Sequence, residues 1–191
     1  SIATVYKNIA KNKYIFSIAF FTGLALTLGV IWMVFAVVLR QARFAAYSIF
    51  MSLAGVYYLA YSGVGFQLFY PTHPEIHNRL FLIALQGALT FSFLFARLHL
   101  EPQKWGLLWI DKALKWLFVI GLILTFNAIF RFSDMLAVIG AMTYSGLMLF
   151  NGLIGVIVWS RSREDFAFWF MIGWLSTGIS MFFLMLFYTL G

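Results

Sequence analysis

The stretch YIFSIAFFTGLALTLGVIWMVFAVVL, residues 14–39, decides the fold, because it runs from Tyr14 to Leu39 without a charged side chain. As an α-helix it is about 39 Å long, at about 1.5 Å of rise per residue. The hydrocarbon core of a bilayer is about 30 Å thick, so this stretch predicts a membrane-spanning helix. Its apolar residues are continuous, whereas the strands of a membrane β-barrel alternate apolar and polar residues.

The composition of the whole chain points the same way. Of the 191 residues, 63% are hydrophobic and only 10% are charged, whereas a soluble domain has about 25% charged residues. A soluble fold of this size could not hide so much apolar surface from water, but a lipid bilayer accepts it. The predicted fold class is therefore all-α, a polytopic transmembrane helical bundle.

Further apolar stretches of helical length follow the first, and together they predict about six spans. The expected spans are Tyr14–Leu39, Phe44–Tyr70, Leu80–Ala96, Trp116–Phe130, Met135–Ser160 and Phe166–Leu190. Residues 1–13 are polar and basic and predict an interfacial segment, whereas residues 14–191 predict a single bundle. The link 97–115 mixes charges with tryptophan, which is typical of an interfacial segment.

The formal net charge of +7 does not indicate nucleic acid as a partner, because the basic residues are scattered between the spans. There they fix topology and contact lipid phosphates. Eight Lys and Arg residues lie in the first, third and fifth connections and five lie on the other side. The positive-inside rule therefore places those three connections in the cytoplasm.

Two glycines near the end of the second span form a candidate ligand-binding site. Gly63 and Gly65 would let a ligand or a neighbouring helix approach the backbone. The alternative is a bend that ends the helix before Pro71, and the sequence favours neither reading. Gln67 follows closely and could cap carbonyl groups that such a bend leaves free.

Two amides inside the spans are the other candidate ligand contacts. Gln86 and Asn151 lie in apolar surroundings, where a buried amide needs a partner. One hypothesis is that both amides line a ligand pocket. The favoured hypothesis is that each amide forms a hydrogen bond between helices. The spans contain no Asp, Glu or Lys near their centres, which disfavours an ion-coupled carrier.

Catalytic and metal-binding groups are not predicted. The chain has no cysteine and three histidines, too few for a multi-histidine metal centre. His73 and His77 have helical metal-ligand spacing, but Pro74 between them favours a polar loop. His99 stands alone at a helix end and is expected at the membrane interface. We therefore expect neither a cofactor nor an enzymatic activity.

The stretch YYLAYSGVGFQ, residues 57–67, is followed by Tyr70–Pro71, by Asn78–Arg79 and then by residues 95–97 (Phe-Ala-Arg). This pattern resembles the membrane domain of bacterial 7TM receptors with diverse intracellular signalling modules (7TMR-DISM). The resemblance extends over residues 15–188 and is most specific over residues 57–79. Further along, it rests on Gly146, Gly152 and Gly155.

The resemblance implies signalling in a bacterial inner membrane. Family members carry an extracytoplasmic sensor domain before the bundle, seven helices and a cytoplasmic output domain after them. This sequence has no such sensor domain, seventh helix or output domain, so it is expected to be a fragment or a reduced member that works with other subunits. The predicted function is a signalling module with an output partner; the alternative is a non-catalytic accessory subunit of a larger membrane complex.

Overall fold

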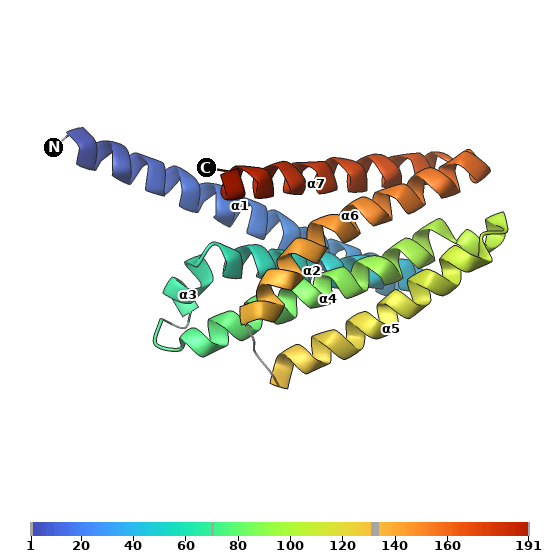
Figure 1. Cartoon of the computed structure of the whole chain (residues 1–191), viewed down its shortest axis with the longest axis horizontal. Helices are drawn as coiled ribbons and strands as arrows, with labels where there is room; N and C mark the ends of the chain where they lie inside the picture. Colours follow the sequence, from blue (N-terminus) through green and yellow to red (C-terminus); the bar gives the residue numbers. More distant parts are fainter. Residues whose placement is uncertain (1, 70, 131–133, 191) are drawn as a thin grey trace.

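The computed structural model of the chain is entirely helical in the residues that it describes (Figure 1). It describes the backbone of residues 2–69, 71–130 and 134–190, and the side chains of residues 15–67, 69, 71–73, 75–130 and 146–179. The elements in chain order are α1 (Ile2–Leu39), α2 (Ala42–Tyr61), α3 (Val64–Phe69), α4 (Pro74–Leu100), the 3-10 turn η1 (Pro102–Trp105), α5 (Leu108–Phe130), α6 (Asp134–Ser162) and α7 (Asp165–Leu190).

The prediction of a polytopic helical bundle is confirmed. Four helices of the described part are long and apolar enough to cross a membrane, and these spans are Ile15–Leu39, Ala42–Tyr61, Glu75–Leu100 and Leu108–Phe130. The last two helices have 29 and 26 residues, lengths that suffice for spanning. Because their side chains are described only in part, six spans remain a prediction.

Several expected boundaries are wrong. The second span does not continue to Tyr70, since α2 ends at Tyr61 and the short α3 follows it. The link 97–115 is not one interfacial segment, because α4 continues to Leu100 and α5 begins at Leu108. Charged residues in the link indicated a polar connection, but Arg97 and Asp111 belong to the facing ends of α4 and α5, where they pair with each other.

The basic segment 1–13 is not a separate helix. Residues 2–13 continue directly into α1, and their position at the membrane interface remains a prediction. The single bundle predicted for residues 14–191 also remains a prediction as a domain boundary.

Helix α4 is at the centre of the bundle and packs against α2, α5 and α6. Of its apolar window, 56% is buried inside the bundle, against 17% in α1 and 11% in α5. Helix α1 packs on α2, and α7 packs on α6. The α4–α5 and α6–α7 connections lie at the end of the molecule far from the N-terminus, at the right of Figure 1. This arrangement agrees with the predicted placement of both connections on one side of the membrane.

Candidate functional site

The chain bends between α2 and α3, where the sequence offers a glycine-rich turn. Gly63 has a φ of +70°, in the left-handed region that glycine adopts without steric cost. The Ser62 hydroxyl donates a hydrogen bond to the carbonyl of Leu59 at 3.0 Å and accepts one from the amide of Val64 at 3.3 Å. Ser62 therefore satisfies backbone groups that the bend removes from regular helical pairing.

The other two residues predicted at this bend lie in α3. Gly65 is buried, whereas Gln67 is exposed. The backbone amide of Gln67 donates to the carbonyl of Gly63 at 3.1 Å and so closes the first turn of α3. The side-chain capping bonds that the structure gives at this bend come from Ser62, which the sequence did not single out.

Asn151, on α6, joins two helices. Its side chain is buried, and its Nδ2 donates to the Ser92 hydroxyl of α4 at 3.1 Å. Ser92 in turn donates to the carbonyl of Leu89 at 2.7 Å. The Asn151 Oδ1 is buried without a hydrogen-bond partner among the described residues. This contact is a hydrogen bond between two helices, the role that the sequence favoured over a ligand contact for Asn151.

The five predicted ligand contacts do not come together in one place. Gly63, Gly65 and Gln67 lie around the α2–α3 bend, whereas Gln86 is half-buried in the interior of α4. Asn151 contacts α4 at Ser92, further along that helix. A ligand role for these residues remains a proposal. The structure separates them into a group at the α2–α3 bend and a group inside the bundle.

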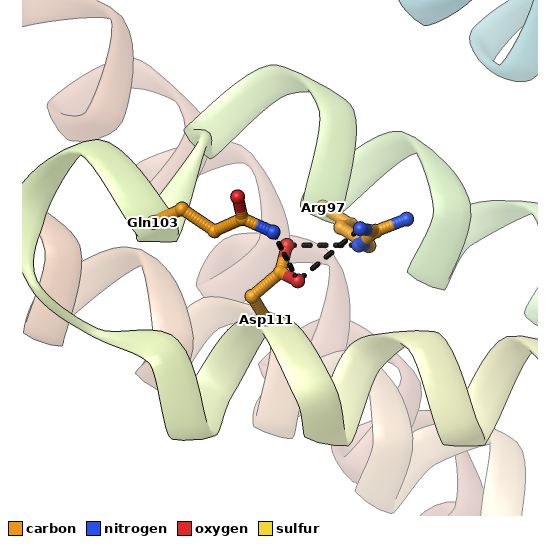
Figure 2. A network of polar contacts seen from close by, with 3 residues as sticks. All are labelled: Arg97, Gln103 and Asp111. Carbon is orange, nitrogen blue, oxygen red and sulfur yellow. Dashed lines mark hydrogen bonds and ion pairs between the residues drawn. The ribbon is translucent and has the colours of Figure 1, made fainter.

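At the opposite end of α4, an ionic network joins this helix to α5 (Figure 2). Arg97, in the last turn of α4, donates from Nε to Asp111 Oδ1 at 2.8 Å and from Nη2 to Oδ2 at 3.2 Å. Gln103 donates from Nε2 to Asp111 Oδ2 at 2.6 Å. The carboxylate, in the first turn of α5, is therefore held between an amide and a guanidinium.

The connecting loop has the conformation that this network requires. Glu101 ends α4 in the left-handed region, with a φ of 44°, and Gly106 ends η1 with a φ of 73°. Pro102 is buried, and its carbonyl accepts from the amide of Leu107 at 3.0 Å. These two left-handed residues turn the chain tightly enough for Arg97 to meet Asp111.

The network makes this connection a rigid joint. The Asp111 side chain is only 9% exposed, and a buried carboxylate is tolerated when it is paired and hydrogen-bonded. Bidentate pairing with an arginine also fixes the direction of approach. The sequence alone did not indicate this site, because Arg97 and Asp111 are separated by a link whose composition is typical of an interfacial segment. The signal was the Pro102 and Gly106 pair, which is typical of a tight turn.

A cavity of about 490 Å³ lies between α1, α2, α4, α6 and α7. Most of its lining is aromatic, and the rings contact each other: Tyr47 and Phe95 centroids are 4.7 Å apart, and Phe50 and Trp174 centroids are 5.3 Å apart. His99 also lines the cavity. None of the five predicted ligand contacts is among the lining residues.

His99 lies in the last turn of α4 and is half-buried, and its position at the membrane interface remains a prediction. Its ring is 5.0 Å from the Phe95 ring and stacks on Phe170 at 5.8 Å, while Phe166 meets it edge-on at 5.7 Å. Among the described residues, no three His, Cys, Asp or Glu side chains gather where they could hold a metal ion.

The helices and the apolar surface define a multi-pass helical membrane domain. A family model described as 7TM diverse intracellular signalling (7TMR-DISM_7TM) matches residues 14–190, and the chain belongs to this family. The resemblance seen in residues 57–79 is thereby confirmed, and the matched domain is a non-catalytic membrane sensor domain associated with signalling proteins. No curated protein and no solved structure matches the chain.

Proposed function

We propose that this membrane domain relays an extracytoplasmic signal to a cytoplasmic output partner in a bacterial inner membrane. The observation that carries the proposal is the position of α4. This helix begins five residues after the end of α3, packs against α2, α5 and α6, and ends beside the Arg97–Asp111–Gln103 network.

The two ends of α4 differ in a way that suits a relay. At the predicted outer end, the chain bends at Gly63, and the short α3 carries the exposed Gln67 and Phe69. At the predicted cytoplasmic end, a buried ion pair couples α4 to α5. Helices in packed bundles transmit signals by small shifts as rigid bodies. A displacement at the bend would therefore reach the α4–α5 joint through α4.

Hydrogen exchange in Gly63→Ala tests this coupling in the full chain, reconstituted in lipid nanodiscs. Nothing lies within 4 Å of a Cβ at Gly63, so the substitution acts through the left-handed backbone, at a cost of about 1–2 kcal/mol. We expect faster amide exchange at the bend and also at residues 101–107. Thermodynamic coupling is reciprocal, so Gly106→Ala, with the same backbone strain, should accelerate exchange at residues 61–66.

Gly146→Ala is the matched control, because Gly146 also has open space around a Cβ and has no positive φ. It should leave exchange at both ends unchanged. If each of the two strained variants changes exchange only around its own site, the ends are uncoupled and the relay proposal is wrong.

We further propose Gly63, Gly65 and Gln67 as signal contacts at the bend, and Gln86 and Asn151 as contacts inside the bundle. The buried Asn151 Oδ1 supports the second group, because it has an unused acceptor among the described residues. Asn151→Leu and Gln86→Leu should weaken the response to a signal while the bundle stays folded. Loss of folding in both variants would assign the two amides to packing alone.

An accessory subunit of a larger membrane complex is the second candidate. It is favoured by the outward faces of α1 and α5, whose apolar windows are only 17% and 11% buried. Such faces suit either lipid or partner helices. The intact mass of the native protein and its co-purifying proteins separate the two functions. A mass near 21.9 kDa with stable membrane partners supports the accessory subunit, whereas a much larger single chain with an output domain supports the relay.

A further inference from the structure

The aromatic cavity has a closed floor and an open side. Phe50, Phe170 and Trp174 are 9%, 6% and 8% exposed and form its floor. Trp169 and Gly173 of α7 also line it and are exposed. Because α7 contributes exposed lining residues, the cavity is open along α7. Its volume is within the range of about 300–1,000 Å³ that small-molecule pockets have.

A guanidinium lies at one end of this cavity. The Arg43 Cζ is 5.1 Å from the centroid of the Phe44 ring, which lines the cavity. His99, which also lines the cavity, lies in the last turn of α4. Positive charge is therefore present where the apolar lining ends.

Next to the cavity lies a second hollow, of about 390 Å³, with a mostly polar lining that includes Arg43, Gln41, Glu101 and Lys104. Lys104 is paired with Glu101, and Arg43 donates from Nε to Gln41 Oε1 at 2.8 Å. Among the described residues, no carboxylate lies within salt-bridge distance of Arg43. The guanidinium therefore has a positive charge without an anionic partner in the described part of the chain.

The Arg43 guanidinium and the aromatic cavity are expected at different depths in the bilayer. Arg43 is the second residue of α2, whose candidate span is Ala42–Tyr61, so its guanidinium is expected at the level of the lipid headgroups. The aromatic cavity extends from there toward the apolar layer, as far as Tyr58. An anionic phospholipid has the same order of parts, with a phosphate at the headgroup level and acyl chains below. Arginine pairs well with phosphate oxygens.

We propose that the cavity between α1, α2, α4, α6 and α7 binds one acyl chain of an anionic phospholipid whose phosphate contacts Arg43. A zwitterionic lipid with the same chains gains the same apolar burial, but its headgroup carries no net charge to match the guanidinium. The site therefore selects for headgroup charge through Arg43 and for an acyl chain through the aromatic lining. This proposal stands independently of the relay.

Native mass spectrometry of the full chain, released from detergent micelles, tests the headgroup. Dioleoyl phosphatidylglycerol and dioleoyl phosphatidylcholine are added separately, because they share acyl chains and differ in charge. We expect one phosphatidylglycerol to be retained preferentially, and Arg43→Gln to lower that preference about fivefold, the value of one arginine at an anionic lipid surface. Arg163→Gln is the matched control, since its guanidinium also lies over a ring, 5.2 Å from the Trp159 centroid, and it should keep the preference.

Gly173→Leu tests the cavity. A Cβ at Gly173 meets nothing within 4 Å, so a leucine side chain there has room to enter the space that an acyl chain would use. We expect retention of both lipids to fall several-fold, whereas Gly23→Leu, at an exposed glycine with equal space that does not line the cavity, should change neither. Gly173→Ala serves as the milder variant if leucine prevents folding, and circular dichroism verifies the helices.

Equal retention of the two lipids by the wild-type chain, or an unchanged preference in Arg43→Gln, overturns the role of Arg43. Unchanged lipid retention in folded Gly173 variants overturns the cavity as the site. A dimer that Gly173→Leu abolishes, without any effect on lipid retention, would mean that a second copy of the chain covers the cavity, and it would also overturn the proposal.

Discussion

The α4–α5 and α6–α7 pairs are both antiparallel helices joined by a tight connection, but different contacts hold them together. The Arg97–Asp111 ion pair joins α4 to α5, and the Thr90 and Thr125 hydroxyls also lie 3.3 Å apart across this pair of helices. Glycines bring α6 and α7 together, whereas in the α4–α5 pair a close approach of Gly121 to Thr90 accompanies the ion pair. A Cβ at Gly155 would lie 2.9 Å from the Met171 Cα, so the two backbones approach closely there.

This difference indicates which helix pair is held in a fixed position and which pair can move. An ion pair with bidentate geometry fixes register and direction, because displacement breaks directional bonds. Contacts between small residues depend on van der Waals packing and have no directional partner to lose. We therefore infer that α4–α5 is the rigid pair and that α7 is free to adjust along α6. The four predictions below test this contrast, from the largest expected effect to the smallest.

Arg97→Leu should have the largest effect. It leaves the Asp111 carboxylate, 9% exposed, with Gln103 as its remaining hydrogen-bond donor. Breaking a buried pair on one side costs about 3–5 kcal/mol, and we expect the free energy of unfolding to fall by that amount in a sodium dodecyl sulfate titration of mixed micelles.

The double variant Arg97→Leu with Asp111→Leu is the control for this prediction. Replacing both partners removes the uncompensated charge, so the double variant should be more stable than Arg97→Leu alone. If the double variant is as unstable as the sum of the single variants, the two residues do not act as a pair, and the α4–α5 joint is not held by this contact.

Gly155→Ala should have the next largest effect. The added methyl group meets backbone as well as side-chain atoms of Met171, so α7 must move away from α6. Overpacking of this kind costs about 1–3 kcal/mol, measured by the same titration. Gly146→Ala adds the same methyl group on the same helix into open space and should not lower stability. Equal stability of both variants would show that α6 and α7 do not depend on close approach at Gly155.

Ser92→Ala tests the contact between the two pairs, because it removes the partner of the Asn151 amide on α6. Interhelical hydrogen bonds in membranes contribute about 0.6 kcal/mol on average and up to about 1.7 kcal/mol. We expect a loss within this range, and a double-mutant cycle with Asn151→Leu should give the coupling energy. A coupling energy of zero would exclude an energetic role for this bond.

Thr125→Val should have the smallest effect. The Thr125 hydroxyl donates to the carbonyl of Gly121 at 2.8 Å, and the Thr90 hydroxyl donates to the carbonyl of Gln86 at 2.7 Å. Both hydroxyl protons are thus used within their own helices, so the contact between the hydroxyls adds little. We expect a loss below about 0.6 kcal/mol. A larger loss in the free energy of unfolding would mean that the hydroxyl contact stabilises the α4–α5 pair together with the ion pair.

The sequence predicted the helices well, because long apolar runs have few alternatives in a bilayer. It predicted the end of α1 at Leu39 and the start of α7 to within one residue, at Phe166 in place of Asp165. It also singled out Gly63, where the backbone has a positive φ. These features follow from local properties, namely hydropathy and the conformational freedom of glycine.

The polar network and the cavity could not be predicted in the same way. Asp111 is charged in sequence but almost fully buried in the fold, because Arg97 and Gln103 are brought to it by two left-handed residues. The cavity depends on residues from five helices, and aromatic side chains such as Phe50 and Trp174 are equally typical of lipid-facing or packing positions. Only the arrangement of the helices shows whether such an aromatic side chain lines the cavity or faces lipid.

The Arg97–Asp111 pair also has a consequence for how the chain enters the membrane during synthesis. Arg97 precedes Asp111 in the chain, so α4 is synthesised before the carboxylate that pairs with its arginine. A charge at that end holds α4 in its orientation. We expect the two helices to pair as a hairpin once α5 has been synthesised, with the ion pair holding them together. The joint that stiffens the finished domain is therefore expected to guide its assembly as well.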